Sequence, residues 1–307
     1  MNKPSVLARG DTVQIVAPAS PVKEEAVRLM QHYLMQLGLD VQLGRHIFEQ
    51  DGYLAGSDDL RIEDLQHAIE NPNVKAIFCA RGGYGSARLL PHLDITPLLL
   101  RPKIFWGYSD ITYLHTVMIQ QAKMITFHGP MSEEYGTTTV HPHSLSALQQ
   151  LFIPRSLTLY ATQHDYPVFS HSIRAPIVGG NVTVLVGTLG TPYEIDTNGR
   201  ILLLEDVDEE PYAIDRLLNQ LRLSGKLQNC AGIIIADFHD CEPKKGKQSL
   251  SLTRIVYDHI VSAQVPILGG FPIGHCRPNY AIPLGGYAVM NGLDRTLLLE
   301  PGVASPC

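Results

Sequence analysis

A serine stands at the point where an apolar strand is expected to turn into a helix. Residues 104–106 form the apolar run, Gly107 follows, and Ser109 and Asp110 directly precede the expected helix from Ile111. A sharp strand-to-helix turn can lift a serine hydroxyl clear of a sheet and aim backbone N–H groups at a reacting carbonyl. The motif is incomplete, because position 111 carries Ile where G-x-S-x-G has its second glycine. Capping of the helix by Ser109 or Asp110 is therefore the alternative interpretation.

A glycine-rich segment, residues 81–85 (RGGYG), directly follows another expected strand. Consecutive glycines let the backbone turn tightly and approach a ligand, with N–H groups available for an oxyanion. The spacing is neither G-x-G-x-x-G nor that of a Walker loop, so it gives little support to a nucleotide site. A plain tight turn is the other interpretation.

A serine is a weak nucleophile unless a base takes its proton and an acid orients that base. Glu205 follows the apolar run 202–204, so we expect it to be the first residue beyond a strand. The acids at 208–210 are more typical of a solvated turn. His275 is the preferred base among 13 histidines, because it lies between small residues after an apolar strand. A surface or core histidine remains the alternative.

Metal and disulfide chemistry are not indicated. Residues 237–241 (DFHDC) offer mixed ligands, but no second matching group and no H-E-x-x-H motif accompanies them. The five cysteines are widely scattered and contain no C-x-x-C pair, which is typical of a protein from a reducing compartment.

The two halves of the sequence contain different patterns of elements. In the first half, expected strands (12–17, 41–43, 74–79, 104–106) alternate with expected helices (22–37, 60–70 and one from 111). Such alternation predicts a parallel sheet covered on both faces. In the second half, expected strands (182–186, 201–204, 232–236, 266–269) outnumber two helices (213–223, 252–262), which indicates a mixed α+β domain.

We therefore expect an α/β protein with two domains. Residues 1–150 would form an N-terminal domain with Ser109, residues 151–174 a connector, and residues 175–307 a C-terminal domain with Glu205 and His275. Hydrophobic residues make up 45% of the 307 residues and charged residues 18%, as in globular proteins. The net charge of −6 argues against a nucleic-acid or anionic-membrane partner.

The ordered set of motifs resembles the LD-carboxypeptidase family, serine peptidases that include murein tetrapeptide carboxypeptidase and the microcin C7 self-immunity peptidases. The resemblance covers nearly the whole chain. Its segments are VAPAS (16–20), YLAGS (53–57) with Arg61 and Asp64-Leu65, RGGYG (81–85), GYSD (107–110), HGPM (128–131), GGN (179–181), LED (204–206) and GH (274–275).

Residue by residue, the resemblance implies that Ser109 is the nucleophile, Glu205 the acid and His275 the base. The backbone N–H groups of Gly83 and Asp110 would form the oxyanion hole. The family fold implies a flavodoxin-like parallel sheet in the N-terminal domain and a mixed, barrel-like C-terminal domain, usually in a homodimer.

The implied reaction is release of the terminal D-alanine from a murein tetrapeptide through an acyl-enzyme, without a metal or organic cofactor. Recycling of cell-wall peptides in the cytoplasm is the expected setting. One alternative is a microcin-type peptidase that cleaves peptidyl nucleotides. The other is a non-enzymatic α/β protein that binds a phosphate or sugar at its glycine loop.

Overall fold

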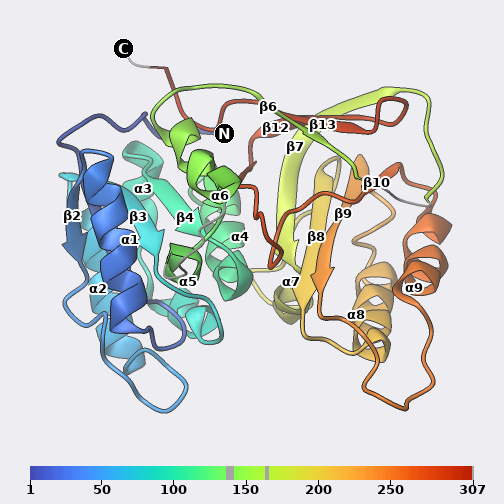
Figure 1. Ribbon diagram of the computed structural model, residues 1–307, viewed down its shortest axis with the longest axis horizontal. Coiled ribbons are helices and arrows are strands. Elements are labelled where there is room, and N and C mark those ends of the chain that lie inside the picture. Colours follow the sequence, from blue (N-terminus) through green and yellow to red (C-terminus); the bar gives the residue numbers. More distant parts are fainter. Residues whose placement is uncertain (136–141, 163–165, 306–307) are drawn as a thin grey trace. The chain divides into compact units, whose positions relative to one another are not determined.

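The computed structural model describes residues 1–135, 142–162 and 166–305 (Figure 1). The chain divides into two compact units. The first consists of Met1–Arg155, Tyr280–Gly285 and Pro301–Cys307, and the second of Ser156–Asn279 and Gly286–Glu300. Short segments from the end of the sequence therefore complete the first unit.

The first unit contains a six-stranded sheet in the order β11-β5-β4-β3-β1-β2. Its strands are β1 (Thr12–Val16), β2 (Asp40–Leu43), β3 (Val74–Cys79), β4 (Ile104–Gly107), β5 (Thr126–His128) and β11 (Ile282–Leu284). The first five are parallel, and β11 is antiparallel to β5. The order 2-1-3-4-5 is that of flavodoxin-like folds, so the predicted fold of this part is confirmed.

Helices join the strands of this sheet. They are α1 (Glu24–Gln36), α2 (Asp58–Glu70), α3 (Thr96–Leu100), α4 (Thr112–Gln120), α5 (Ser132–Tyr135) and α6 (Pro142–Ser146), with 3₁₀ turns η1 (Ser86–His92), η2 (Ser109–Ile111) and η3 (Ala147–Leu151). α1 buries Ala26, Val27, Met30 and Leu34, one apolar stripe at helical spacing. Nowhere in the described ranges is a helix long and apolar enough to cross a membrane.

The order of the strands places the loops after β1 and β3 at a topological switch point. In open parallel sheets, ligands bind beside the carboxyl ends of the strands at such points. The glycine loop follows β3, and Ser109 follows the neighbouring strand β4. The fold therefore brings both segments to one edge of the sheet.

The second unit contains a mixed, curled sheet in the order β10-β9-β8-β7-β12-β13-β6 (Figure 1). The strands are β6 (Leu157–Tyr160), β7 (Ser172–Asn181), β8 (Ile201–Val207), β9 (Gly232–His239), β10 (Ile267–Gly269), β12 (Tyr287–Asn291) and β13 (Thr296–Leu299). β7 to β10 are parallel, and the others pair antiparallel. The predicted mixed, barrel-like architecture is confirmed.

The helices of the second unit are α7 (Val182–Thr188), α8 (Pro211–Leu223) and α9 (Leu252–His259), followed by the turn η4 (Val261–Ala263). The expected strand at 182–186 is wrong, because these residues belong to α7. The side-chain oxygen of Asn181 accepts a hydrogen bond from the N–H of Val184 and begins the helix. A short, buried apolar run has no periodicity that separates helix from strand.

Candidate active site

Ser109 lies in a strained turn between β4 and α4. Its φ is 65°, in the left-handed region that residues other than glycine seldom adopt. The N-cap residues of η2 and α4 are Tyr108 and Ile111, and neither helix begins with a side-chain cap hydrogen bond. The capping interpretation therefore does not account for Ser109. Backbone strain at a strand-to-helix turn is typical of an exposed nucleophile.

The backbone before Ser109 is held by buried polar contacts. The Tyr108 hydroxyl donates to Oε1 of Glu134 at 2.6 Å. The carbonyl oxygen of Gly107 accepts from the N–H of Gly129 at 3.1 Å and contacts Nε2 of His115 at 2.8 Å. Burial lowers the pKa of His115 to about 3, so the ring is neutral and donates from Nε2. These contacts fix the end of β4.

The side chain of Asp110 bonds away from the helix that follows it. Its carboxylate accepts from the N–H of Ser86 at 2.8 Å, and its carbonyl accepts from the Ser86 hydroxyl at 2.7 Å. Burial raises the pKa of this carboxyl group, since only 3% of the residue is exposed. Asp110 therefore ties η2 to the start of η1, which follows the glycine loop.

The glycine loop packs directly against Ser109. A Cβ atom added to Gly82 would lie 2.8 Å from Cβ and 3.0 Å from Oγ of Ser109, and 3.3 Å from the backbone nitrogen of Asp110. Gly83 has φ 102°, and a Cβ there would collide with the side chain of Ser20. Only glycines allow this approach of loop to serine.

The loop after β1 also contacts the glycine loop. The N–H of Ser20 donates to the carbonyl of Gly82 at 3.1 Å, and the N–H of Tyr84 donates to Oγ of Ser20 at the same distance. Reasoning from the sequence placed Ser20 in a family motif but gave it no role. Its position after a strand that ends at a switch point was the available signal.

Arg61 joins the same two loops from α2. Its side chain is 1% exposed and donates through Nη1 to the carbonyls of Pro18 at 2.6 Å and Gly85 at 3.0 Å. It also pairs with Asp58. A buried arginine that satisfies two loop carbonyls and one carboxylate fixes the positions of both loops.

The second unit brings Glu205 and His275 together. Nδ1 of His275 lies 2.7 Å from Oε2 of Glu205, although 70 residues separate them. The Glu205 side chain is fully buried and that of His275 is 16% exposed. Nδ1 is thus the ring nitrogen that faces the carboxylate, which fixes the orientation of the imidazole.

Glu205 lies inside β8, so the expectation that it is the first residue beyond the strand is wrong. The register of β8 against β9 shifts between Leu204 and Asp206. Ala236 and Asp237 of β9 both lie opposite Glu205, so the extra residue is in β9 and β8 continues without one. The strand therefore runs past the acid to Val207.

Gly274 allows His275 to reach the acid. Its φ is 115°, and a Cβ at this position would lie 2.7 Å from Oε2 of Glu205. Its N–H donates to Oδ1 of Asn279 at 3.1 Å, which holds the turn. The lack of space beside the Glu205 carboxylate therefore explains why a glycine precedes His275.

The neighbouring acid, Asp206, has a structural role. Its carboxylate accepts from Nδ2 of Asn181 at 2.8 Å and from the N–H and hydroxyl of Thr183, both at 2.9 Å. Burial raises its pKa. These bonds hold the first turn of α7 against β8.

Asp237 is a charged residue near this pair that reasoning from the sequence considered only as a metal ligand. Its N–H donates to the carbonyl of Ile273, two residues before Gly274, at 3.2 Å. Burial is the main cause that raises its pKa, and the charge of Glu205 raises it further. Among the described residues, no group of three or more His, Cys, Asp or Glu side chains is arranged to hold a metal ion.

The predicted site residues thus form two groups. Ser109, Gly83 and Asp110 lie around one turn of the first unit, and Glu205 and His275 are in contact in the second. Each group lies near the carboxyl ends of parallel strands. The first can present a hydroxyl and backbone N–H groups, and the second can accept and return a proton.

Comparisons with known proteins identify the family of the chain. The models of the LD-carboxypeptidase N-terminal and C-terminal domains match residues 13–129 and 174–290. The chain is 46% identical to the probable murein peptide carboxypeptidase of Bacillus subtilis (strain 168), over 98% of this chain and 95% of that protein. It is 33% identical to the murein tetrapeptide carboxypeptidase of Pseudomonas aeruginosa, over 91% and 93% of the two chains.

The fold also resembles a solved structure. The crystal structure of an MccF-like protein from Bacillus anthracis str. Ames has a TM-score of 0.87 and 25% identity, and the similarity covers 98% of this chain and 100% of that one. The two family models together match most of the sequence, including Ser109, Glu205 and His275. The chain therefore belongs to the LD-carboxypeptidase family of peptidases.

Proposed function

We propose that this protein is a serine-type LD-carboxypeptidase that releases the terminal D-alanine from murein tetrapeptides. The observation that carries the proposal is the 2.7 Å contact between Nδ1 of His275 and the buried carboxylate of Glu205. An oriented imidazole on a buried acid is the arrangement that activates a serine. The strained turn at Ser109 and the names of the two murein-peptide relatives support the same reaction.

In the proposed mechanism, Nε2 of His275 takes the proton of the Ser109 hydroxyl while Nδ1–H stays bonded to Glu205. The serine oxygen attacks the carbonyl carbon of the diamino acid that precedes D-alanine. The resulting oxyanion accepts hydrogen bonds from the backbone N–H groups of Gly83 and Asp110. His275 then protonates the amine of D-alanine, which leaves an acyl-enzyme on Ser109.

Water completes the reaction. His275 removes its proton, the water oxygen attacks the acyl carbon, and Ser109 recovers its proton as the tripeptide leaves. This sequence needs no metal or organic cofactor. It requires Nε2 of His275 to reach Oγ of Ser109 during turnover. We further propose that the enzyme acts on free peptides in the cytoplasm, during recycling of the cell wall, and as a homodimer.

A second candidate is a microcin-type peptidase that cleaves peptidyl nucleotides, which the similarity to the MccF-like structure favours. Such a substrate needs an aromatic side chain to stack on its base. Trp106, the sole tryptophan of the chain, does not meet this need. It is fully buried and donates through Nε1 to the carbonyl of Pro130 at 2.7 Å. The identities of 46% and 33% to the two murein-peptide relatives favour the murein peptide as the substrate.

Release of free D-alanine from the tetrapeptide L-Ala-γ-D-Glu-meso-diaminopimelate-D-Ala tests the proposal. We expect Ser109→Ala to lower kcat by about 10³-fold or more, with little change in substrate binding. Ser170→Ala, a substitution at an exposed serine, is the matched control. A serine-directed phosphonate should form a covalent adduct with the wild type that Ser109→Ala does not form. Full activity of Ser109→Ala would refute the serine mechanism, whereas failure of the wild type to release D-alanine would favour a binding protein.

Cleavage of an aminoacyl sulfamoyl adenylate, measured in parallel, distinguishes the two peptidase candidates. A murein carboxypeptidase should release D-alanine with the higher kcat/KM. The reverse ranking would identify the microcin-type substrate as the better one. Loss of both activities in Ser109→Ala would show that one serine serves both reactions.

A further inference from the structure

A hollow of about 260 Å³ lies in the first unit, at the edge of the sheet opposite Ser109. Val74, the first residue of β3, lines it, and so does Lys103, which directly precedes β4. The amino ends of these strands therefore form the floor of the hollow. Ser109 follows the carboxyl end of β4, so the hollow is separate from the proposed active site.

Three basic side chains line this hollow: Lys75, Arg101 and Lys103. No Asp or Glu belongs to the described residues that line it. Lys75 and Arg101 are exposed, whereas Lys103 is 4% exposed. Burial and, to a lesser extent, the positive charges of Arg101 and Lys75 together lower the pKa of Lys103 to about 8. Like charges therefore repel one another around this hollow.

The ammonium group of Lys103 is held in place. Nζ donates to the carbonyls of Ala68 at 2.7 Å and Asn71 at 2.6 Å, at the carboxyl end of α2. An ammonium group has three N–H donors, so two bonds leave one for a ligand. Lys103 is thus a fixed donor rather than a flexible surface lysine.

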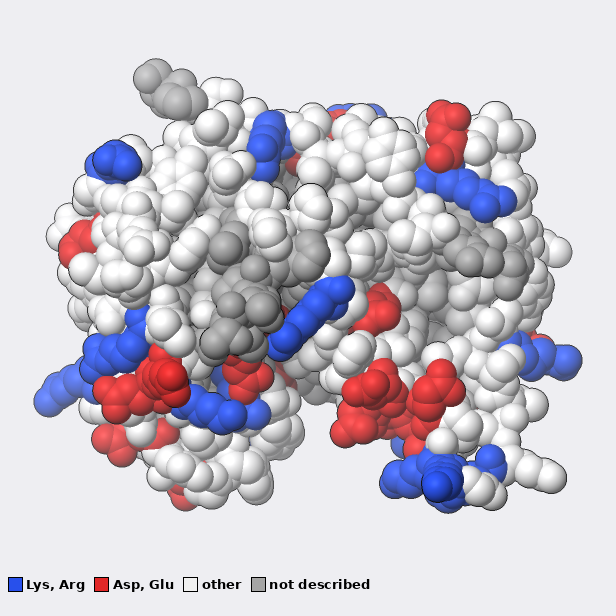
Figure 2. Space-filling model, viewed as in Figure 1, with Lys and Arg blue, Asp and Glu red and all other residues white. Residues whose placement is uncertain are grey.

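Some exposed cations of the chain pair with acids, but those of the hollow pair with none of the described acids. Arg88 pairs with Asp58 at 2.7 Å, and Arg254 pairs with Asp258 at 2.8 Å. Figure 2 shows basic and acidic side chains side by side at several places on the face drawn. Within the described ranges, Lys75 and Arg101 have no such acid partner.

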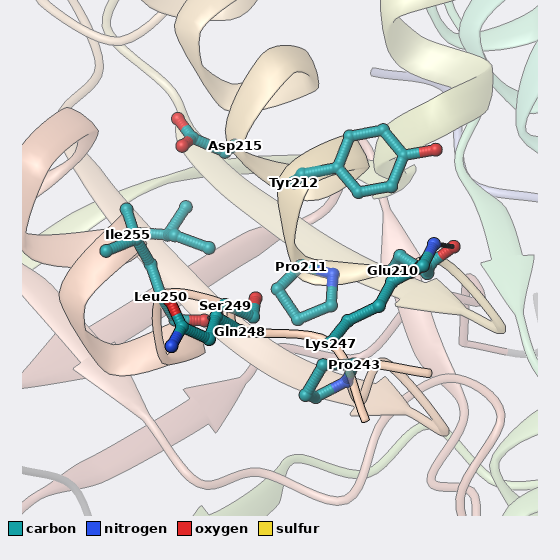
Figure 3. Close-up of a pocket in the computed structure, with 10 residues that line it drawn as sticks. All are labelled: Glu210, Pro211, Tyr212, Asp215, Pro243, Lys247, Gln248, Ser249, Leu250 and Ile255. Atoms are coloured by element: carbon teal, nitrogen blue, oxygen red, sulfur yellow. Dashed lines mark hydrogen bonds and ion pairs between the residues drawn. The ribbon is translucent and has the colours of Figure 1, made fainter. Parts of the chain in front are cut away.

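A second hollow, of about 220 Å³ in the other unit, has the opposite character (Figure 3). Its charged residues already have partners within the chain. Glu210 pairs with Lys247 at 3.1 Å, and Asp215 contacts Nε2 of His259 at 2.5 Å. A charged ligand there would have to break these pairs. The hollow beside Lys103 requires no such exchange.

We propose that the hollow between Lys75, Arg101 and Lys103 binds a small oxyanion with two or more negative charges. The planar guanidinium of Arg101 can donate two parallel hydrogen bonds to a phosphate or carboxylate group. Lys103 supplies a fixed N–H, and Lys75 supplies a further charge at the rim. The space admits a phosphate ester or a small polycarboxylate, and both share this chemistry.

Calorimetry on the full-length protein tests the site with two probes, inorganic phosphate and citrate, at constant ionic strength. We expect saturable binding of one ion per chain to the wild type, and a higher Tm at saturation because the ligand binds the folded state. The double variant Lys75→Ala/Arg101→Ala should bind at least tenfold more weakly. Lys245→Ala removes an exposed lysine of the other unit and should bind as the wild type does.

Binding of one probe but not the other would support the site and identify its preferred oxyanion. If the double variant is poorly folded, the single variant Arg101→Gln provides the same test at one exposed residue. Failure of both probes to bind the wild type saturably would overturn the proposal. Unchanged binding by the double variant would also overturn it. D-alanine release by these variants should equal that of the wild type, so the outcome is independent of the proposed catalytic mechanism.

Discussion

Gly82 offers the most direct test of how the glycine loop positions the serine. Gly82 has no positive φ, so an alanine there meets no backbone strain of its own. The obstacle is a contact. The new Cβ would lie 2.8 Å from Cβ of Ser109, whereas carbon atoms in contact prefer about 3.5–4.0 Å. The loop and the serine must therefore separate by about 1 Å.

A displacement of this size sets the expected magnitude. A 1 Å error in the position of a reacting group can cost about 10²-fold in rate, which corresponds to about 3 kcal/mol of transition-state stabilisation. The displaced loop also includes Gly83, whose N–H we assign to the oxyanion hole. We therefore expect Gly82→Ala to lower kcat/KM for the tetrapeptide by about 10²-fold.

The assay is coupled detection of D-alanine, with thermal unfolding measured on the same samples. Gly10→Ala is the control, because Gly10 has φ 88° and open space around its Cβ position. Its strained backbone should cost about 1–2 kcal/mol of stability and leave kcat/KM unchanged. If Gly82→Ala keeps kcat/KM within threefold of the wild type, the proposed role of the loop is wrong.

Three further predictions concern the acid, the glycine before the histidine, and the buried histidine of α4. Glu205→Gln should lower kcat by about 10²- to 10⁴-fold in steady-state assays, because a neutral amide does not stabilise the imidazolium form of His275; an unchanged kcat would argue against a charged partner. Gly274→Ala should reduce both activity and Tm, since its Cβ would meet Oε2 of Glu205 at 2.7 Å, whereas Gly225→Ala, in open space, should keep activity. His115 has a folded-state pKa of about 3, below its usual 6.5, so the unfolded chain binds the extra proton and stability falls as pH falls from 6.5 to 3. Between pH 7 and pH 4.5, this group should lower the free energy of unfolding measured in urea by about 3 kcal/mol. The His115→Gln variant should not show this loss. Equal losses in both proteins would refute the assignment.

The sequence predicts the first sheet well because its strands are continuous apolar runs. Residues 76–79 and 104–106 are buried on both faces, so helices must cover both sides. The pairing of β11 with β5 was not predictable, because Ile282 and His128 are far apart in the chain. Short strands that join distant segments carry little local signal.

The candidate site was only partly predictable. The residue types at 109 and 275 indicate their chemistry, but the contact of His275 with Glu205 spans 70 residues, and no local pattern reports it. Only the resemblance of the ordered motifs to a known family placed these residues in one site. The left-handed φ of Ser109 and the continuation of β8 past Glu205 depend on tertiary packing, which overrides local preference.

The close approach of Gly274 to the carboxylate of Glu205 has an evolutionary consequence. A Cβ at one position and a full-length glutamate at the other cannot coexist without rearrangement. A shorter aspartate at position 205 would withdraw the carboxylate by one methylene and make room for a small side chain at 274. Substitutions at these two positions are therefore expected to arise together in homologues, as a compensating pair.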